Sequence, residues 1–181
     1  MTTILQAREN IKDAVETGVS SFKHVAVHGG RFTSDEIRRY AVKAPAALVA
    51  CLGIDNIVDT MVDLVATMRW GIYVVTRGDS STRRDSEALT LIQALAVLVK
   101  GNDFDESALV RPENLRAENI YSGGIDNKGI ALWALTWTQD QSISDFDLSE
   151  LDDFDTYHAQ WDLDLDDDVI DAEDHLTGLA T

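Results

Sequence analysis

Apolar residues recur along the chain with two different periods, which predict an alternation of helices and strands. Residues 4–18 carry apolar side chains three and four positions apart, as an amphipathic helix does. Residues 61–77 instead alternate, with an apolar side chain at every second position from Val62 to Val74, which is typical of a strand with one buried face. Residues 82–100 return to helical spacing, and their buried stripe is expected at Ala88, Leu91, Ile92, Leu95, Ala96 and Val99. Further apolar residues at Leu89, Val97 and Leu98 predict that both sides of this helix are covered.

Shorter segments complete the pattern. We expect strands over residues 22–28 and 45–53, and a short helix after a Thr33-to-Glu36 capping box. Residues 113–123 and 128–139 are predicted to be two strands joined by the glycine-rich turn 123–129. Since hairpins alternate with helices, the order predicts an α+β fold: a mostly antiparallel β-sheet packed against two or three α-helices.

Charge divides the chain into two parts. The formal net charge is −17, yet residues 145–181 alone contain 14 Asp and Glu and no Lys or Arg. Residues 1–144 hold the other 18 acidic residues and all 15 basic ones, so their net charge is only about −3. We therefore expect an α+β domain over residues 1–144 and an acidic C-terminal arm over residues 145–181. Such an arm repels phosphate, which argues against DNA binding.

The sequence also argues against membrane and secreted classes. No run of about 18 apolar residues is present, and the first residues lack the pattern of a secretion signal. The single cysteine, Cys51, excludes an internal disulfide and lies in an apolar run, where a buried thiol is expected rather than a nucleophile. The simplest expectation is a protein made inside the cell and kept reduced.

The stretch VAVHGGRFTSDEIRRY, residues 25–40, has the outline of a phosphate-binding turn. A strand enters Gly29-Gly30, and a helix follows. However, the stretch lacks the lysine of a P-loop and the third glycine of a dinucleotide fingerprint. Asp35 and Glu36 also occupy the first turn of the helix, where they satisfy the positive end of its dipole. A structural corner is therefore favoured over an anion site.

Other candidate chemistry is weak. His24 and His28 are expected on one face of a strand, but a metal site needs at least one more ligand, and none is obvious nearby. Ser80, Ser81 and Ser86 have no partner histidine in a recognisable motif, so nucleophilic catalysis has no support. The Arg77-Gly78-Asp79 tripeptide is expected to form a turn before a helix rather than an adhesion motif. We predict no catalytic, cofactor-binding or metal-binding residues, and no cofactor.

Arginines supply the candidate contact surfaces of the domain. Arg38 with Arg39, and Arg83 with Arg84, form pairs on two predicted helices. They either form solvated faces or bind carboxylates of neighbouring subunits, which arginine forks do well. Arg31 and Phe32 are expected to project from the glycine turn, where a neighbour could also contact them.

The sequence of the acidic arm contains two patterns, one typical of a helix and one typical of a strand. Leu151, Phe154, His158, Trp161 and Leu165 fall on one stripe of a helix that Ser149 could cap. Residues 161–166 instead alternate strictly, as an added edge strand would. A disordered tail that only adds solubility is the simpler interpretation, but the arm contains more aromatic residues than such a tail requires. We therefore expect an arm that orders on a partner through Phe154 and Trp161.

Several segments together resemble the tail terminator proteins of Mu-like long-tailed bacteriophages. They are the strand ending VHGGRF, the segments APAALVACLG and DLVATMRWGIYVVTR, the RPENL loop, the turn at residues 121–124 and the strand GIALWALTW. The resemblance covers about residues 3–142 and rests on structural rather than chemical motifs. The acidic arm has no counterpart in it.

The resemblance implies a structural protein of the virion, not an enzyme. Tail terminators form a hexameric ring that caps the tail tube, ends its polymerisation and joins it to the head-completion proteins. The implied partners are further copies of the chain, the tail tube protein and a head–tail connector protein, with DNA only passing through the channel and no membrane involved. The implied location is the neck of the tail, after synthesis in the host cytoplasm. A negative lumen would keep phosphate from binding there.

Two other functions stay open. The first alternative is an acidic inhibitor or DNA mimic that acts through the C-terminal arm. The second is a small metal-dependent enzyme that uses His24 and His28.

Overall fold

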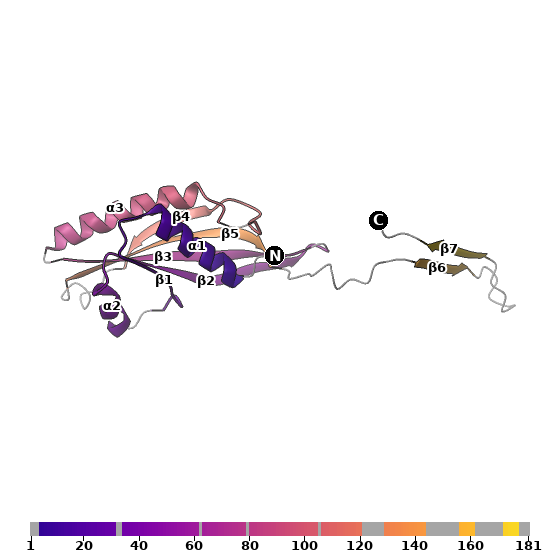
Figure 1. The fold of residues 1–181 in the computed structure, drawn as a ribbon, viewed down its shortest axis with the longest axis horizontal. Coiled ribbons are helices and arrows are strands. Elements are labelled where there is room, and N and C mark those ends of the chain that lie inside the picture. Colours follow the sequence, from indigo (N-terminus) through magenta and orange to yellow (C-terminus); the bar gives the residue numbers. More distant parts are fainter. Residues whose placement is uncertain are drawn as a thin grey trace. The chain divides into compact units, whose positions relative to one another are not determined.

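Figure 1 shows a computed structural model of the chain, which describes residues 4–31, 34–61, 63–78, 80–104, 106–120, 129–143, 156–161 and 172–177. The chain divides into two compact units, Met1–Asp145 and Phe146–Thr181. This division lies one residue from the expected boundary between the domain and the acidic arm. The first unit is called the body below.

One mixed sheet forms the body. The described residues place its strands in the order β1 (His24–Val27), β2 (Ala46–Asp59), β3 (Leu64–Arg77), β5 (Ile130–Ser142) and β4 (Glu113–Asn119). Only the β1–β2 pair is parallel, and every other neighbouring pair is antiparallel. Together with the helices, this arrangement confirms the predicted α+β fold.

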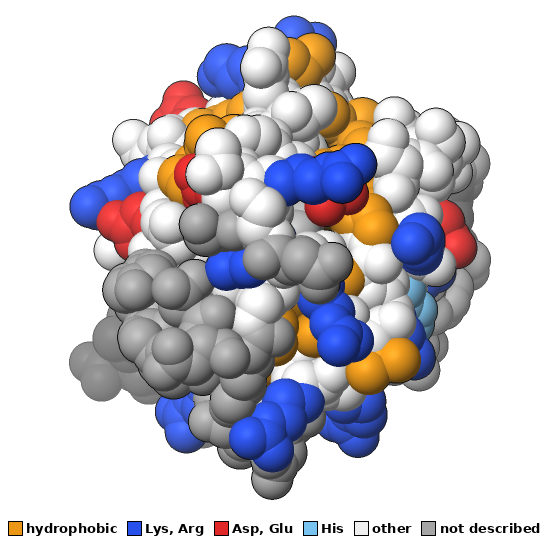
Figure 2. Space-filling view, turned by 90° about the vertical axis from the view of Figure 1, so that its left-hand side faces the viewer, with side chains coloured by type: hydrophobic (Ala, Val, Ile, Leu, Met, Phe, Trp, Pro, Cys, Tyr) orange, Lys and Arg blue, Asp and Glu red, His pale blue; other side chains and the backbone are white. Residues whose placement is uncertain are grey.

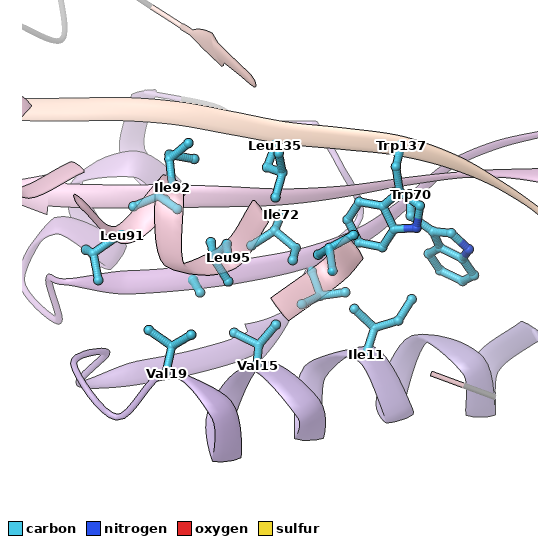
Figure 3. Packing of buried hydrophobic residues seen from close by; sticks show 14 of the residues in the cluster. Ile11, Val15, Val19, Trp70, Ile72, Leu91, Ile92, Leu95, Leu135 and Trp137 are labelled. Atoms are coloured by element: carbon cyan, nitrogen blue, oxygen red, sulfur yellow. The ribbon is translucent and has the colours of Figure 1, made fainter. Parts of the chain in front are cut away.

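Two helices cover one face of the sheet. Helix α1 (Ile4–Gly18) and helix α3 (Ser81–Lys100) direct apolar side chains at the strands, as Figure 3 shows for Ile11, Val15 and Leu95. The strand side of this core includes Trp70 and Trp137, which lie opposite each other on β3 and β5 and are at most 2% exposed. The predicted buried face is confirmed from Ala66 to Val74, because Ala66, Met68, Trp70, Ile72 and Val74 are all buried; Leu64 is half-buried.

Helix α2 (Ser34–Ala41) lies on the other face of the sheet. Its Ile37 and Ala41 pack against Leu48, Val75 and Leu132 in a second, smaller core. This core sits at one end of the sheet, near the end of β3 and the start of β5. In Figure 1, α2 and the beginning of α3 accordingly lie at the same end of the body.

Strand β2 is longer than predicted. It was expected to end at residue 53, but it pairs with β3 as far as Asp59. Two β-bulges, at Cys51/Gly53 and Asp55/Val58, absorb the residues that break the alternation, and Asn56 adopts a positive φ of 48° within the second one. Conversely, Met61 belongs to the following turn, with a φ of 69°, so β3 begins at Leu64 rather than at residue 61.

The described residues of the body do not cover the outer side of α3. Leu98 packs on the core, but Leu89 is 45% exposed and Val97 is 71% exposed. The prediction that both sides of this helix are covered is therefore wrong within the described residues of the body. The predicted buried stripe is confirmed at Ala88, Leu91, Ile92, Leu95 and Val99, whereas Ala96 is half-buried.

The second unit contains an antiparallel pair of strands, β6 (Thr156–Trp161) and β7 (Ala172–Thr177). Residues 156–161 were expected on a helix under one of the two alternatives, and that alternative is wrong there. The alternating segment 161–166 lies outside the described residues except for Trp161, the last residue of β6.

Candidate interaction surfaces

The Gly29-Gly30 corner is held by hydrogen bonds to neighbouring side chains of the body. Gly30 has a φ of 80°, its N–H donates to His28 Nδ1 at 3.0 Å, and its carbonyl accepts from the Tyr73 hydroxyl at 3.3 Å. A Cβ on Gly30 would lie 3.1 Å from Leu52 Cδ2, whereas one on Gly29 would meet nothing within 4 Å. These contacts agree with a structural corner. Thr33 of the expected capping box lies outside the described residues.

Gly30→Ala is expected to lower the free energy of unfolding by about 1–2 kcal/mol, because a side chain must then adopt left-handed backbone and press on Leu52. Urea unfolding followed by circular dichroism measures the change. Gly29→Ala is the matched control and is expected to change stability by less than about 0.5 kcal/mol. Equal losses in the two variants would contradict this account of the corner.

His24 and His28 both pack against Tyr40 from α2. The ring centroids lie 6.1 Å apart in the stacked His24–Tyr40 pair and 5.7 Å apart in the edge-on His28–Tyr40 pair. The second ring nitrogen of His28 lies 3.9 Å from Glu36. Among the described residues, no group of three or more His, Cys, Asp or Glu could hold a metal ion. In the structure, these histidines instead contribute aromatic packing between α2 and the β1 segment.

Burial lowers the pKa of His28 below its ordinary value, against the opposing effect of Glu36. The unfolded chain therefore takes up a proton first as the pH falls below about 6.5, and stability is lost from there down to the folded-state pKa. Protonation at Nδ1 also removes the acceptor for the Gly30 N–H. We expect His28→Asn, which keeps an acceptor but does not titrate, to lose less stability than the unaltered protein between pH 7.5 and 5.0. Urea midpoints at the two pH values measure this difference, and identical losses would refute it.

The end of the body that carries α2 is rich in arginine. Arg38 and Arg39 are exposed in the last turn of α2, Arg77 is exposed at the end of β3, and Arg83 is exposed in the first turns of α3. Figure 2 looks onto this end and shows Lys and Arg side chains spread over it, with fewer Asp and Glu between them. Arg39 also lies 3.8 Å from Glu36 and 5.7 Å from the centre of the Tyr40 ring.

A hollow of about 640 Å³ opens where β3 ends and α3 begins. We call it the arginine hollow. Its lining residues are Arg77, Gly78, Ser80, Arg83, Arg84, Ser86, Glu87 and Thr90. The exposed Leu89 follows on the same helix. The hollow thus combines positive charge, hydroxyl groups and the apolar stems of long side chains.

The two arginines of the Arg83–Arg84 pair have different environments. Arg83 is exposed, but Arg84 is only 6% exposed and donates from Nη1 to the Gly78 carbonyl at 2.8 Å. Its own carbonyl accepts from the buried Thr76 hydroxyl at 3.0 Å. The expectation that Arg84 belongs to an exposed contact surface is therefore corrected: its side chain holds the turn between β3 and α3.

The other predicted contact residues are Arg31, Phe32, Phe154 and Trp161. Arg31 is exposed after the glycine corner, and Phe32 and Phe154 lie outside the described residues. Trp161 ends β6, where it pairs with Ala172. The structure brings Arg83 and Arg77 together at one hollow, and it places Arg38 and Arg39 on the opposite face of the sheet at the same end of the body.

Sequence reasoning missed the surface at the opposite end of the body. The hairpin between β2 and β3 ends in the segment Ile54–Asp63, which we call the hairpin tip. The large apolar side chains that the structure describes in it are exposed: Ile54 by 40%, Val58 by 53%, Ile57 by 58% and Met61 by 97%. The segment also contains Asp55, Asp59 and Asp63 and no Lys or Arg. In the sequence, Asp55 and Asn56 interrupt the apolar run there, and in the structure a bulge lies between Asp55 and Val58.

Hydrogen bonds hold the hairpin tip in a defined shape. Asp59 accepts from the Met61 N–H at 2.9 Å, and the Thr60 hydroxyl donates to the Asp63 carbonyl at 2.7 Å. Asp63 accepts from the hydroxyl of Ser142, the last residue of β5, at 2.6 Å. Arg69 pairs with Asp55 at 2.6 Å. The tip therefore keeps two carboxylates, on Asp59 and Asp63, that none of the described basic residues neutralises through an ion pair.

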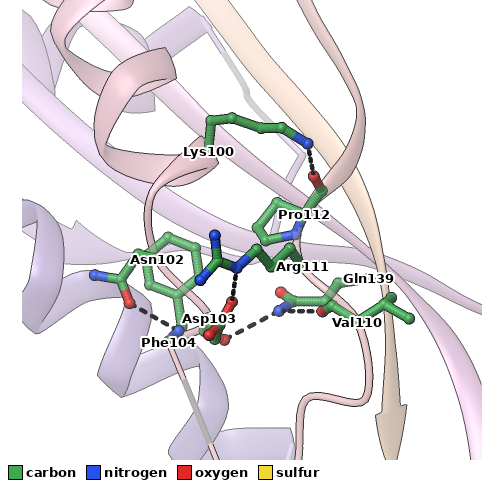
Figure 4. Close-up of polar contacts among 8 residues, drawn as sticks. All are labelled: Lys100, Asn102, Asp103, Phe104, Val110, Arg111, Pro112 and Gln139. Carbon is green, nitrogen blue, oxygen red and sulfur yellow. Dashed lines mark hydrogen bonds and ion pairs between the residues drawn. The ribbon is translucent and has the colours of Figure 1, made fainter.

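A second exposed segment lies beside the end of β5. Buried Gln139 donates to the carbonyls of Asp103 and Val110, at 3.0 and 3.1 Å, and so anchors the loop after α3, as Figure 4 shows. In that loop Leu109 is 53% exposed and Val110 is 39% exposed. The end of the body that carries the hairpin tip is therefore apolar and acidic, in contrast to the arginine-rich end.

The described residues offer little reactive chemistry elsewhere. Burial raises the pKa of the half-buried Cys51 thiol, which disfavours the nucleophilic thiolate. No helix in the described part of the chain is long and apolar enough to cross a bilayer.

In comparisons with known proteins, no family model matches the chain and no curated protein sequence is significantly similar to it.

Proposed function

We propose that the chain is a structural protein of a long-tailed bacteriophage: a tail terminator whose homohexameric ring caps the tail tube, ends its polymerisation and joins it to the head-completion proteins. The proposal starts from the resemblance in residues 3–142. Its partners are further copies of the chain, the tube protein and a connector protein, while DNA passes through the ring.

The observation that carries the proposal is the exposed apolar surface of the hairpin tip. Ile57, Val58 and Met61 are each more than half exposed on a projecting turn that hydrogen bonds hold in place. A soluble monomer rarely leaves clustered large apolar side chains in water, so such clusters mark interaction sites. A subunit that works only within an assembly accounts for this exposure, as it does for Leu89 and Val97 on α3.

The two ends of the body also suit a ring. A closed ring needs a heterologous contact, in which one surface of each subunit meets a different surface of the next. The arginine-rich end and the acidic, apolar end of the body are two such different surfaces, with opposite charge. The net charge of −17 is compatible with a lumen through which DNA slides without binding.

Deletion of the gene in the phage that encodes the chain tests the proposal. We expect tails of abnormal, extended length that carry no heads, and restoration of normal virions by a copy of the gene supplied in trans. Electron microscopy of the lysate measures tail length and head attachment. Tails of normal length joined to heads would refute the terminating role.

One observation favours a second candidate, an inhibitor or DNA mimic that acts through the acidic arm. The unit Phe146–Thr181 is compact in itself and contains the paired strands β6 and β7, although it carries no Lys or Arg to balance its carboxylates. Removal of residues 145–181 separates the two functions. A mimic loses its activity with the arm, whereas a terminator body still assembles and restores tail length in the deletion strain.

A further inference from the structure

The exposed apolar side chains of the hairpin tip need a partner, and the body itself offers a complementary surface. The tip presents Ile57, Val58 and Met61 together with the carboxylates of Asp59 and Asp63. The arginine hollow presents the guanidinium groups of Arg77 and Arg83 around a concave floor. We propose that the hairpin tip of one copy docks into the arginine hollow of the next copy, so that identical subunits associate head to tail.

Shape supports this pairing. The hairpin tip is convex and its turn is fixed by the Asp59, Thr60 and Asp63 hydrogen bonds, so docking orders few additional groups. A hollow of about 640 Å³ accommodates several side chains of the size of methionine and isoleucine. Met61, at 97% exposure, is the most exposed large apolar residue of the tip and the one best placed to enter first.

The charges of the two surfaces also favour contact between the hairpin tip and the arginine hollow. The tip segment contains Asp55, which pairs with Arg69 of β3, and the carboxylates of Asp59 and Asp63, but no basic residue of its own. Among the described residues that line the hollow, two exposed arginines and the buried Arg84 accompany one carboxylate, Glu87. Opposite charges on two surfaces attract, and two copies of either surface repel each other. A twofold contact of tip with tip would place apolar side chains together but also the carboxylates of Asp59 and Asp63 from both copies. Head-to-tail contact avoids this repulsion.

The positions of the two surfaces exclude an intramolecular contact. The tip lies where β3 begins and the hollow where β3 ends, so the full 14-residue strand separates them within one copy. Contact between them therefore joins different copies, and repetition of the same contact gives a closed ring or an open filament. The inference rests on the proposed function only for the choice of a closed ring; the contact itself is independent of it.

Disulfide trapping of the full-length protein tests the contact. Cys51, the single cysteine, is first replaced by alanine. Met61→Cys and Ser86→Cys then place one thiol on the tip and one on the exposed wall of the hollow. At low salt with a mild oxidant, the double variant is expected to form a ladder of disulfide-linked oligomers. Each single variant alone is expected to remain monomeric in denaturing electrophoresis, and an equal mixture of the two is expected to give linked dimers.

Two matched variants serve as controls. Gln93→Cys, exposed on the same helix two turns beyond Ser86, replaces the hollow cysteine and is expected to cut cross-linking with Met61→Cys at least tenfold. In the double-cysteine protein, Arg83→Glu is expected to slow ladder formation by a similar factor, whereas Arg116→Glu, an equal charge change on β4, leaves the rate within about twofold.

Two results would overturn the proposed contact: efficient dimers from Met61→Cys alone, which indicate a twofold contact of tip with tip, or no ladder from the double variant at low salt. Neither result depends on tail length in the deletion strain, so failure of this contact is distinguishable from failure of the proposed function. Rings seen by electron microscopy without these cross-links would leave the assembly role standing and reject only the head-to-tail pair.

Discussion

Replacing Trp70 by alanine is expected to lower the free energy of unfolding by about 3–5 kcal/mol. Trp70 is fully buried on β3, opposite Trp137 of β5, at the centre of the core that α1 and α3 cover. Its removal leaves a large cavity that the paired strands cannot close, because both are held by hydrogen bonds along their length. Since small domains have only about 5–15 kcal/mol of stability, the variant is expected to be close to unfolding at 37 °C.

Urea unfolding followed by circular dichroism measures this loss, and two tryptophan-to-phenylalanine variants define its cause. The indole N–H of Trp70 has no hydrogen-bond partner among the described residues, so Trp70→Phe loses volume alone and costs much less than Trp70→Ala. Trp133 is half-buried and donates to Asp85 at 3.1 Å, so Trp133→Phe loses about 1 kcal/mol with that bond. A Trp70→Ala variant as stable as Trp133→Phe would contradict the central position of Trp70.

Arg84→Ala is expected to lower the free energy of unfolding by about 2–3 kcal/mol, although the residue is charged and lies near the start of helix α3. Its stem is buried and its guanidinium satisfies the Gly78 carbonyl, so alanine removes packing and leaves that carbonyl without its donor. Arg83→Ala, one position earlier and exposed, is expected to change stability by less than about 0.5 kcal/mol.

Thermal or urea unfolding of the two alanine variants side by side measures the contrast. Arg84→Met keeps most of the buried stem but not the donor, and is expected to fall between Arg84→Ala and the unaltered protein. Equal stabilities for Arg83→Ala and Arg84→Ala would show that the buried guanidinium contributes nothing to the turn.

Strong periodicity made the main elements of the body predictable. Helix α1 has the expected bounds of residues 4–18, and the alternation around Trp70 gives the buried face of β3 correctly. The extension of β2 was not predictable from periodicity, because Gly53, Asp55 and Asn56 interrupt the alternation. Only the pairing with β3 and the two bulges keep these residues in a strand.

The candidate surfaces were predicted less well, for physical reasons that particular residues show. Arg84 lies four positions before Ala88 and thus on the buried stripe of α3. This spacing predicts burial, but the charge of Arg84 and the adjacent Arg83 led to the prediction of an exposed pair. The hairpin tip was missed because Ile57, Val58 and Met61 are ordinary core residue types. Their exposure results from a bulge and a turn beyond the reach of α1 and α3, which only three-dimensional structure places.

The position of β3 between two antiparallel partners has a consequence for hydrogen exchange. It pairs with both β2 and β5 from Val65 to Val75, and its inward side chains from Ala66 to Val74 are fully buried. Backbone amides with such protection exchange with solvent only when the whole domain opens, whereas edge strands exchange through smaller local openings. Amides of β3 from Trp70 to Val75 are therefore expected to take up deuterium more slowly than any others in the body. Those of the four-residue β1 and of the exposed β4 are expected to exchange faster. The strand that separates the two proposed contact surfaces would then also be the most persistent part of the fold, a rigid spacer that fixes the distance between one contact and the next.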